Sequence, residues 1–172
     1  MITTQSVDTA GSFKVMDSPG ALSIDPKNKK KLKILLIDDD IEMSEIVKNC
    51  LSFRYNCKVD VASDPFEAMN TMTDKFYDLI ILDWRLPALT GGQTLKELEK
   101  GFYFEPELPL QWDRQRVPVV ILSGSEKAKC HLYKTKHFDC IGFVSKRQSL
   151  HGIVDSFESY IQLANEKYSS VG

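Results

Sequence analysis

The sequence lacks the features of a membrane-inserted or secreted protein. No stretch of its 172 residues approaches the roughly 20 apolar residues of a membrane span, and the N-terminus has no apolar signal core. The four cysteines include no C-x-x-C pair, so we expect reduced, buried thiols in a cytoplasmic protein. A formal net charge of only -2 gives no electrostatic reason to expect nucleic acid or an anionic membrane as a partner.

The sequence does contain a series of short aliphatic runs that each end on a polar residue. Runs of this kind, rich in Ile, Leu and Val, are typical of parallel strands that are buried on both faces. Strands are predicted at residues 33–38, 78–83, 117–123 and 140–146, and a weaker alternating segment at 57–62 predicts an edge strand. With 42% hydrophobic residues, the chain is large enough to bury one core.

Helical patterns lie between these strands. The sequence Asp64-Pro65-Phe66-Glu67 offers an N-cap, a proline at the first helical position and a capping-box glutamate, which predicts a helix start. Two further helices are predicted from apolar residues at helical spacing. Their faces are Met43, Ile46, Val47, Cys50 and Leu51 in the first, and Leu150, Ile153, Val154, Phe157, Ile161 and Ala164 in the last. The alternation predicts an α/β fold with a parallel sheet covered by helices on both faces.

Two segments do not fit this alternation. Residues 1–31 are rich in Ser, Thr, Asp, Gly and Pro and end in a basic run, which predicts a disordered extension with a solvated linker. Residues 101–117 form an unusually long connection with several aromatic residues, which we interpret as a loop closed down on the domain by its own apolar cluster.

Polar residues close the core strands in an informative order. The first strand runs into Asp38 and Asp39, the second core strand ends at Asp83, the next at Ser123-Gly124, and the last at Ser145-Lys146. Each residue alone has an ordinary explanation, such as a helix cap or a surface lysine. The carboxyl ends of parallel strands share one edge, however, so we expect these side chains in a common pocket.

This set of side chains suits a metal ion and a phosphoryl group. Carboxylates held this close raise one another's pKa unless a cation is present, and Mg²⁺ (or Mn²⁺) prefers carboxylate oxygens together with phosphate. Asp83 can act as a nucleophile toward phosphorus, while Lys146, Ser123 and the backbone at Gly124 can contact phosphoryl oxygens. A second group, Cys130, His131, His137 and Cys140, has none of the usual zinc-finger spacings, and we predict no zinc site there.

The motifs LLIDDD, LIILDWRLP followed by TGG, VVILSGS and GFVSK together resemble the receiver domain of bacterial response regulators. The resemblance implies a flavodoxin-like, doubly wound (βα)5 fold with a five-stranded parallel sheet in the order 2-1-3-4-5. It assigns residues 32–168 to a receiver domain, preceded by the extension at 1–31 and followed by a short tail at 169–172.

The resemblance also implies a role for each residue at the sheet edge. Asp83 would accept a phosphoryl group from a phosphohistidine on a sensor histidine kinase or a histidine phosphotransfer protein. Asp39 would bind Mg²⁺ directly, Asp38 would bind it through water, and the main-chain carbonyl of Arg85 would complete the metal site. Ser123 and Lys146 occupy the positions of the family's hydroxyl residue and lysine. The chain would catalyse its own phosphorylation and dephosphorylation without turning over other substrates.

The resemblance further implies a switch that couples Ser123 to the aromatic side chain of Phe143. Phosphorylation would reshape the face formed by the family's fourth helix, fifth strand and fifth helix, for an output protein that the sequence does not identify or for a homodimer. Lysines are frequent in that part of the sequence, which fits either an acidic partner or a solvated face. They are Lys127, Lys129, Lys134 and Lys136. One departure is that Arg147 follows the lysine, where the family usually has proline.

Two other functions are compatible with parts of this pattern. Asp38 and Asp40 have the D-x-D spacing of haloacid-dehalogenase-like phosphatases, although that function leaves Asp83 without a role. A receiver-like interaction module that is never phosphorylated is the other alternative, and the complete acidic group argues against it.

Overall fold

The computed structural model describes residues 30–104, 116–124 and 134–169. The chain divides into the units Met1–Lys30 and Lys31–Gly172, and everything below concerns the second unit. Most of the expected N-terminal extension, the aromatic loop from residue 105 to 115 and the expected tail from residue 170 onward lie outside the described residues. So do Lys127, Lys129, Cys130 and His131.

Five parallel strands form one sheet in the order β2-β1-β3-β4-β5, as the sequence predicts. The strands are β1 (Leu32–Ile37), β2 (Cys57–Ala62), β3 (Leu79–Asp83), β4 (Val117–Ser123) and β5 (Phe138–Ser145). The alternating segment is the edge strand β2. Three of the aliphatic runs form the inner strands β1, β3 and β4, and the fourth forms β5 at the other edge of the sheet.

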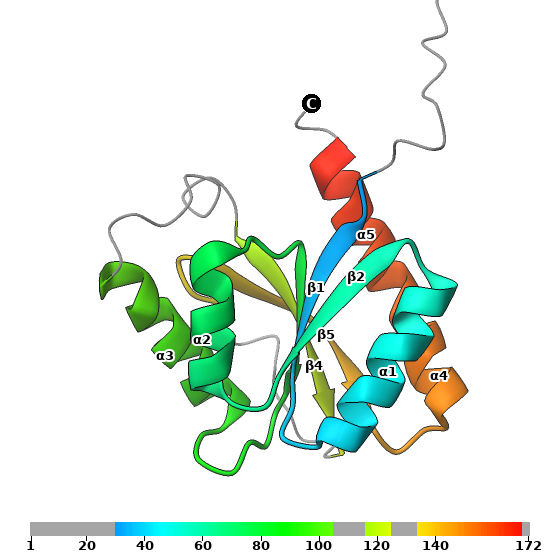
Figure 1. Ribbon diagram of the computed structural model, residues 1–172, viewed down its shortest axis with the longest axis horizontal. Helices are drawn as coiled ribbons and strands as arrows, with labels where there is room; N and C mark the ends of the chain where they lie inside the picture. The colour runs from blue at the N-terminus through cyan, green and yellow to red at the C-terminus, as the bar shows by residue number, and fades with distance from the viewer. Residues whose placement is uncertain (1–29, 105–115, 125–133, 170–172) are drawn as a thin grey trace, which may run out of the picture. The chain divides into compact units, whose positions relative to one another are not determined.

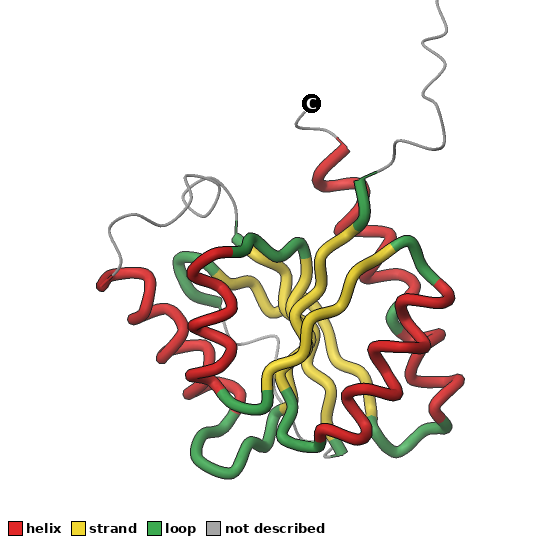
Figure 2. The backbone as a smooth tube through the Cα atoms, viewed as in Figure 1, coloured by secondary structure: helices red, strands yellow, loops and turns green. Residues whose placement is uncertain are grey.

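Helices cover both faces of this sheet (Figures 1 and 2). On one face lie α1 (Ile41–Arg54), α4 (Leu150–Ser156) and α5 (Glu158–Ser169), and on the other lie α2 (Pro65–Asp74) and α3 (Gly91–Phe104). The predicted last helix is thus two helices joined at Phe157, and both follow β5. The family's fourth helix would fall between β4 and β5, where residues 125–133 lie outside the described part of the chain.

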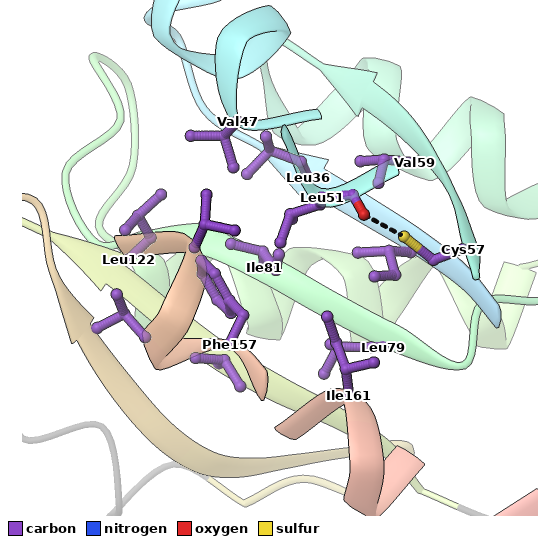
Figure 3. Packing of buried hydrophobic residues seen from close by; sticks show 14 of the residues in the cluster. Leu36, Val47, Leu51, Cys57, Val59, Leu79, Ile81, Leu122, Phe157 and Ile161 are labelled. Atoms are coloured by element: carbon purple, nitrogen blue, oxygen red, sulfur yellow. Dashed lines mark hydrogen bonds between the residues drawn. The ribbon is translucent and has the colours of Figure 1, made fainter. Parts of the chain in front are cut away.

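Each face of the sheet has its own apolar core, because successive side chains of a strand point to opposite faces. In β1, Leu35 and Ile37 pack toward α2 and α3, whereas Ile34 and Leu36 pack toward α1, α4 and α5. Figure 3 shows the second core. There the Cys57 thiol donates to the main-chain oxygen of Leu51 at 3.4 Å, and burial raises the pKa of Cys57 to about 11.

Helix α1 differs from the prediction in the face that it buries. The residues turned to the sheet are Ser44, Val47 and Leu51, while Ile46 is 46% exposed and Phe53 is 95% exposed. Ser44, Val47 and Leu51 follow a spacing of three and four residues that keeps them on one side of the helix, and Ile46 lies about 100° away from Val47. The expected single apolar face is therefore two faces, one buried and one open.

Helix α2 begins with the predicted N-cap, but its glutamate does not form the predicted capping box. Asp64 caps α2 by accepting from the amides of Phe66 and Glu67, but the Glu67 carboxylate bonds to the amide and hydroxyl of Ser63, one residue before the cap. The predicted connection at residues 101–117 begins too early, because α3 continues through Phe104. The connection to β4 is correspondingly shorter than predicted.

A polar cluster joins β2 to the turn after α2. The Tyr77 hydroxyl donates to Asp60 Oδ2 at 2.7 Å, and the Lys75 ammonium lies 3.0 Å from the same oxygen. Burial alone would raise the pKa of Asp60, but the hydrogen bonds from Tyr77 and Lys75 outweigh it and lower this pKa. Burial and the Asp60 carboxylate raise the pKa of Tyr77, so the phenol keeps its proton and remains the donor.

The Tyr77→Phe variant is expected to lose about 1–2 kcal/mol of unfolding free energy at neutral pH, because it removes a hydrogen bond to an ionised carboxylate. The pKa of Asp60 in the folded protein lies below its unfolded value of about 4. The contribution is therefore present above about pH 4 and is lost as the pH falls through the folded value. Urea unfolding at about pH 7 and at about pH 3 measures both differences.

The matched control is Tyr55→Phe, which removes a hydroxyl that donates to the neutral carbonyl of Val154 at 3.2 Å. Its destabilisation should change less with pH across this range. Equal destabilisation of Tyr77→Phe at the two pH values would contradict the assignment.

Candidate functional site

The carboxyl ends of the strands bring the predicted polar residues to one edge of the sheet. Asp38 directly follows β1, Asp83 is the last residue of β3, Ser123 is the last residue of β4, and Lys146 directly follows β5. The register places Asp83 opposite Leu122 and Ser123 opposite Ser145, so these ends lie level with one another. The parallel arrangement thereby assembles residues that are far apart in the sequence.

Three carboxylates form the centre of this edge. One oxygen from each of Asp38, Asp39 and Asp83 lies within 4.8 Å of the others. Asp38 is 1% exposed and Asp83 is 7% exposed, whereas Asp39 is exposed. The third aspartate, Asp40, serves as the N-cap of α1 by accepting from the Met43 amide at 3.0 Å, so it is held by the helix instead.

The Lys146 ammonium lies between two of these carboxylates. Its Nζ atom is 2.6 Å from Asp38 Oδ2 and 2.9 Å from Asp83 Oδ2, with only 18% of the side chain exposed. Burial alone would lower the pKa of Lys146, but the hydrogen bonds to Asp38 and Asp83 outweigh it and raise this pKa. Burial raises the pKa of Asp38 despite the opposing effect of Lys146. The ammonium is thus the internal counter-charge of the acidic cluster.

The hydroxyl residue and the neighbouring backbone complete the edge. Ser123 is fully buried, and its main-chain oxygen accepts from the Lys146 amide at 2.8 Å. The Arg85 amide donates to Asp83 Oδ1 at 3.2 Å, which fixes one carboxylate oxygen of Asp83. Phe143 is half-buried against the core under α2 and α3, and it lies opposite Ile121, two residues before the Ser123–Ser145 pair.

A close contact behind Asp83 was not foreseen from the sequence. The Gly91 amide donates to the main-chain oxygen of Trp84 at 2.8 Å. A Cβ at position 91 would lie 2.8 Å from Trp84 Cε3 and 3.2 Å from Trp84 Cα, so a glycine is required there. Two hydrogen bonds close the start of α3. The side-chain oxygen of Gln93 accepts from the main-chain amide of Thr90, and the hydroxyl oxygen of Thr90 accepts from the main-chain amide of Gln93. This close packing positions the residue that follows Asp83.

Of the cysteine and histidine group considered in the sequence, Cys130 and His131 lie outside the described residues. His137 is buried at the amino end of β5, and its Nδ1 atom lies 2.9 Å from Glu99 Oε1 in α3. In the same described ranges, the three aspartates are the sole group of at least three potential metal ligands. Carboxylates are the hard oxygen ligands that Mg²⁺ prefers, so this donor set fits that ion.

The chain belongs to the response regulator receiver domain family, whose model matches residues 34–158. The family match and the relatives support a phosphorylation-dependent switch of two-component signalling, and the phosphatase alternative is not favoured. Receiver domains as a class bind Mg²⁺ in an acidic pocket and work with sensor kinases or phosphotransfer proteins and with output domains.

Curated relatives come from bacteria. One is the autoinducer 2 sensor kinase/phosphatase LuxQ of Vibrio parahaemolyticus, 39% identical over 72 residues, which are 42% of this chain and 8% of the relative. Another is the CpxR homologue of Haemophilus influenzae, a transcriptional regulatory protein, 38% identical over 68 residues, which are 40% of this chain and 29% of the relative. The chain therefore matches less than a third of each of these proteins.

Solved structures show the same fold. The receiver domain of Francisella response regulator 1452 matches with a TM-score of 0.58 at 23% identity, over 80% of this chain and 99% of that one. A CheY-like receiver domain from Methylobacillus flagellatus matches with a TM-score of 0.57 at 22% identity, over 78% of this chain and 99% of that one. No helix within the described ranges has the length and apolar character needed to cross a membrane.

The Lys146→Met variant is expected to bind Mg²⁺ roughly three- to tenfold more tightly in the absence of phosphoryl donor. The substitution removes a positive charge that repels the ion and frees carboxylate oxygens on Asp38 and Asp83. Isothermal titration calorimetry with Mg²⁺ at neutral pH measures the dissociation constants.

Lys100→Met is the control, because Lys100 pairs with Glu97 on the exposed side of α3. It should leave the affinity for Mg²⁺ unchanged. Unchanged or weaker binding by Lys146→Met would show that Lys146 does not compete with the ion.

Proposed function

We propose that Asp83 is the phosphoryl acceptor of this receiver. Three observations on the described residues support the choice. Asp83 lies in the middle of the acidic edge, one of its oxygens is held by the Arg85 amide, and the other lies 2.9 Å from the Lys146 ammonium. Its exposed fraction of 7% leaves a small part of the residue accessible to a donor. Asp38 is more deeply buried and Asp39 is exposed, which suits them less well to attack.

The reaction transfers a phosphoryl group between two proteins. A carboxylate oxygen of Asp83 bonds to phosphorus while the bond from phosphorus to the donor histidine nitrogen breaks, and that nitrogen keeps the electron pair. Lys146 and the Ser123 hydroxyl contact the phosphoryl oxygens, and the Gly124 amide is a further donor. In a reaction of this kind, positioning and charge neutralisation account for most of the catalysis.

Asp38, Asp39, Asp83 and the main-chain carbonyl of Arg85 would hold Mg²⁺, or Mn²⁺ in its place. The bound ion supplies positive charge to the carboxylates and to the phosphoryl oxygens. The carboxylate oxygens grouped within 4.8 Å support this assignment. Asp38 would contribute through water and Asp39 directly.

The output of the switch is a change on the surface around β5. Phosphorylation would draw Ser123 toward the phosphoryl group, and Phe143 would turn into the space that Ser123 leaves. Support comes from the half-buried position of Phe143 and from Tyr160 of α5, whose ring packs directly on Gly142 and leaves no room for a Cβ there. The partner would be an output protein or a second copy of the chain bound through this surface.

We also propose the domain limits and the compartment. The receiver would occupy residues 32–168, with an extension before it and a short tail after it. The cytoplasm is the expected location, because phosphohistidine donors obtain their phosphoryl group from ATP. The free thiols of Cys50, Cys57 and Cys140 are compatible with a reducing compartment.

A donor that reaches Asp83 must also contact the start of α1, which lies beside Asp38 and Asp39. Two apolar side chains of α1 are exposed there, Ile41 at 47% and Ile46 at 46%, and Phe53 at 95% extends this surface along the helix. It continues into a groove of about 360 Å³ between α1 and α4, lined by Cys50, Phe53, Arg54, Leu150, His151 and Val154. We assign this surface to a helix of the phosphohistidine donor, whose apolar face would cover it.

Incubation with acetyl phosphate and Mg²⁺ is expected to add the mass of one phosphoryl group to the protein. The Asp83→Asn variant and a sample without divalent metal should gain nothing, because each removes a part of the proposed reaction. Intact-protein mass spectrometry measures the gain. Labelling that persists in Asp83→Asn but is lost in Asp38→Asn would revive the phosphatase alternative, and no labelling of the wild type beside a labelled reference receiver would favour the interaction module.

The Ile46→Glu variant is expected to slow phosphoryl transfer from phosphorylated histidine phosphotransfer domains of the same genome by about tenfold or more, because it places a charge in an apolar contact. Labelling by acetyl phosphate should stay at the wild-type rate, since a small donor does not touch α1. Phe66→Glu is the control, at an apolar position on α2 that is more exposed than Ile46 (70% against 46%). Equal transfer rates for the two variants would place the donor elsewhere.

A further inference from the structure

The turn after β5 is held by hydrogen bonds of Arg147, the residue that directly follows Lys146. Arg147 has an amide hydrogen, and this amide donates to the Ser145 hydroxyl at 3.2 Å. A proline could not donate this bond. This hydrogen bond therefore closes the turn across Lys146.

The side chain of Arg147 makes a second contact that crosses to the neighbouring strand end. Its Nε atom donates to the main-chain oxygen of Gly124 at 2.8 Å, over 23 residues of sequence separation. The Lys146 amide donates to the main-chain oxygen of Ser123, also at 2.8 Å. Two consecutive residues after β5 are thus tied to the two consecutive residues Ser123 and Gly124, one through the backbone and one through a side chain.

These two bonds hold the groups that would receive the phosphoryl oxygens. Ser123 carries the hydroxyl, Gly124 carries the adjacent amide, and Lys146 carries the ammonium that bridges Asp38 and Asp83. Without the bond from Arg147, Gly124 loses its hydrogen-bonded tie to the turn that carries Lys146. A shift of about 1 Å in such groups is enough to weaken transition-state contacts strongly.

We propose that Arg147 is a positioning residue for phosphoryl-group binding, which acts by fixing Gly124 and the Ser123 hydroxyl relative to Lys146. This inference rests on the proposed function, and it is argued from the two hydrogen bonds that tie the turn after β5 to Ser123 and Gly124. Arg147 is exposed, and its Nε atom bonds to the main-chain oxygen of Gly124, so it acts on the site through this loop.

The structure provides a closely matched control. Arg116 is also exposed, and its Nε atom donates to a main-chain oxygen, that of Thr135, at the same distance of 2.8 Å. It directly precedes β4, whereas Ser123 ends that strand, so Arg116 lies at the opposite edge of the sheet. Arg116→Ala removes the same charge and the same kind of bond without touching the site.

The test measures binding of beryllofluoride, a phosphoryl mimic, in saturating Mg²⁺ by isothermal titration calorimetry. Arg147→Ala is expected to bind it about five- to tenfold more weakly than the wild type, the range of one lost hydrogen bond. Arg147→Lys, which keeps the charge and a donor, should recover part of this loss. Arg116→Ala should bind like the wild type. The affinity of every variant for Mg²⁺ alone should stay within about twofold, because the three aspartates are unchanged.

The outcomes separate this inference from the proposed function. If the wild type binds no beryllofluoride and is not labelled on Asp83, the proposed function itself fails. If the wild type binds and Arg147→Ala binds equally well, only the role of Arg147 is overturned. Parallel losses of Mg²⁺ affinity and of thermal stability in Arg147→Ala would also overturn it, since they would show general damage to the fold.

Discussion

The acidic edge of this protein depends on one ammonium group. Lys146 lies within 3 Å of both Asp38 and Asp83, two carboxylates that are almost completely buried. Two ionised carboxylates that are buried close together destabilise each other. The Lys146 ammonium offsets this repulsion in the absence of another cation. A divalent ion or a phosphoryl group would each add charge to this site and thereby change the interaction of Lys146 with the two carboxylates.

The sheet makes this arrangement possible. All five strands are parallel, so every strand ends at the same edge, and helices cover both faces and leave this edge as the accessible side. Two apolar cores hold the strand ends in register. The fixed register explains how Asp83, Ser123 and Lys146 meet although more than 20 residues separate each from the next.

Helix α1 illustrates how the same segment can stabilise the fold and present a surface. Val47 and Leu51 are buried against the sheet, while Ile46 and Phe53 remain exposed on a separate side. Exposed apolar residues in isolation are ordinary, but these lie in a row that leads from the acidic edge to the groove against α4. Val47 and Leu51 lie in the core that holds the helix on the sheet, whereas Ile46 and Phe53 lie outside this core and are available to a partner.

The sequence by itself determined the strands and the residues at the acidic edge, and its resemblance to receiver domains implied the order of the strands in the sheet. Continuous aliphatic runs specify buried parallel strands, and the polar residues that end them are local in sequence, so both can be read without coordinates. The tertiary structure decided which apolar residues of α1 are buried, where α3 ends, and the break between α4 and α5. It also decided the contacts of Gly91 with Trp84, of His137 with Glu99 and of Arg147 with Gly124. The physical reason is that these features depend on the distance between segments remote in sequence, and periodicity describes only the relation of a residue to its own neighbours.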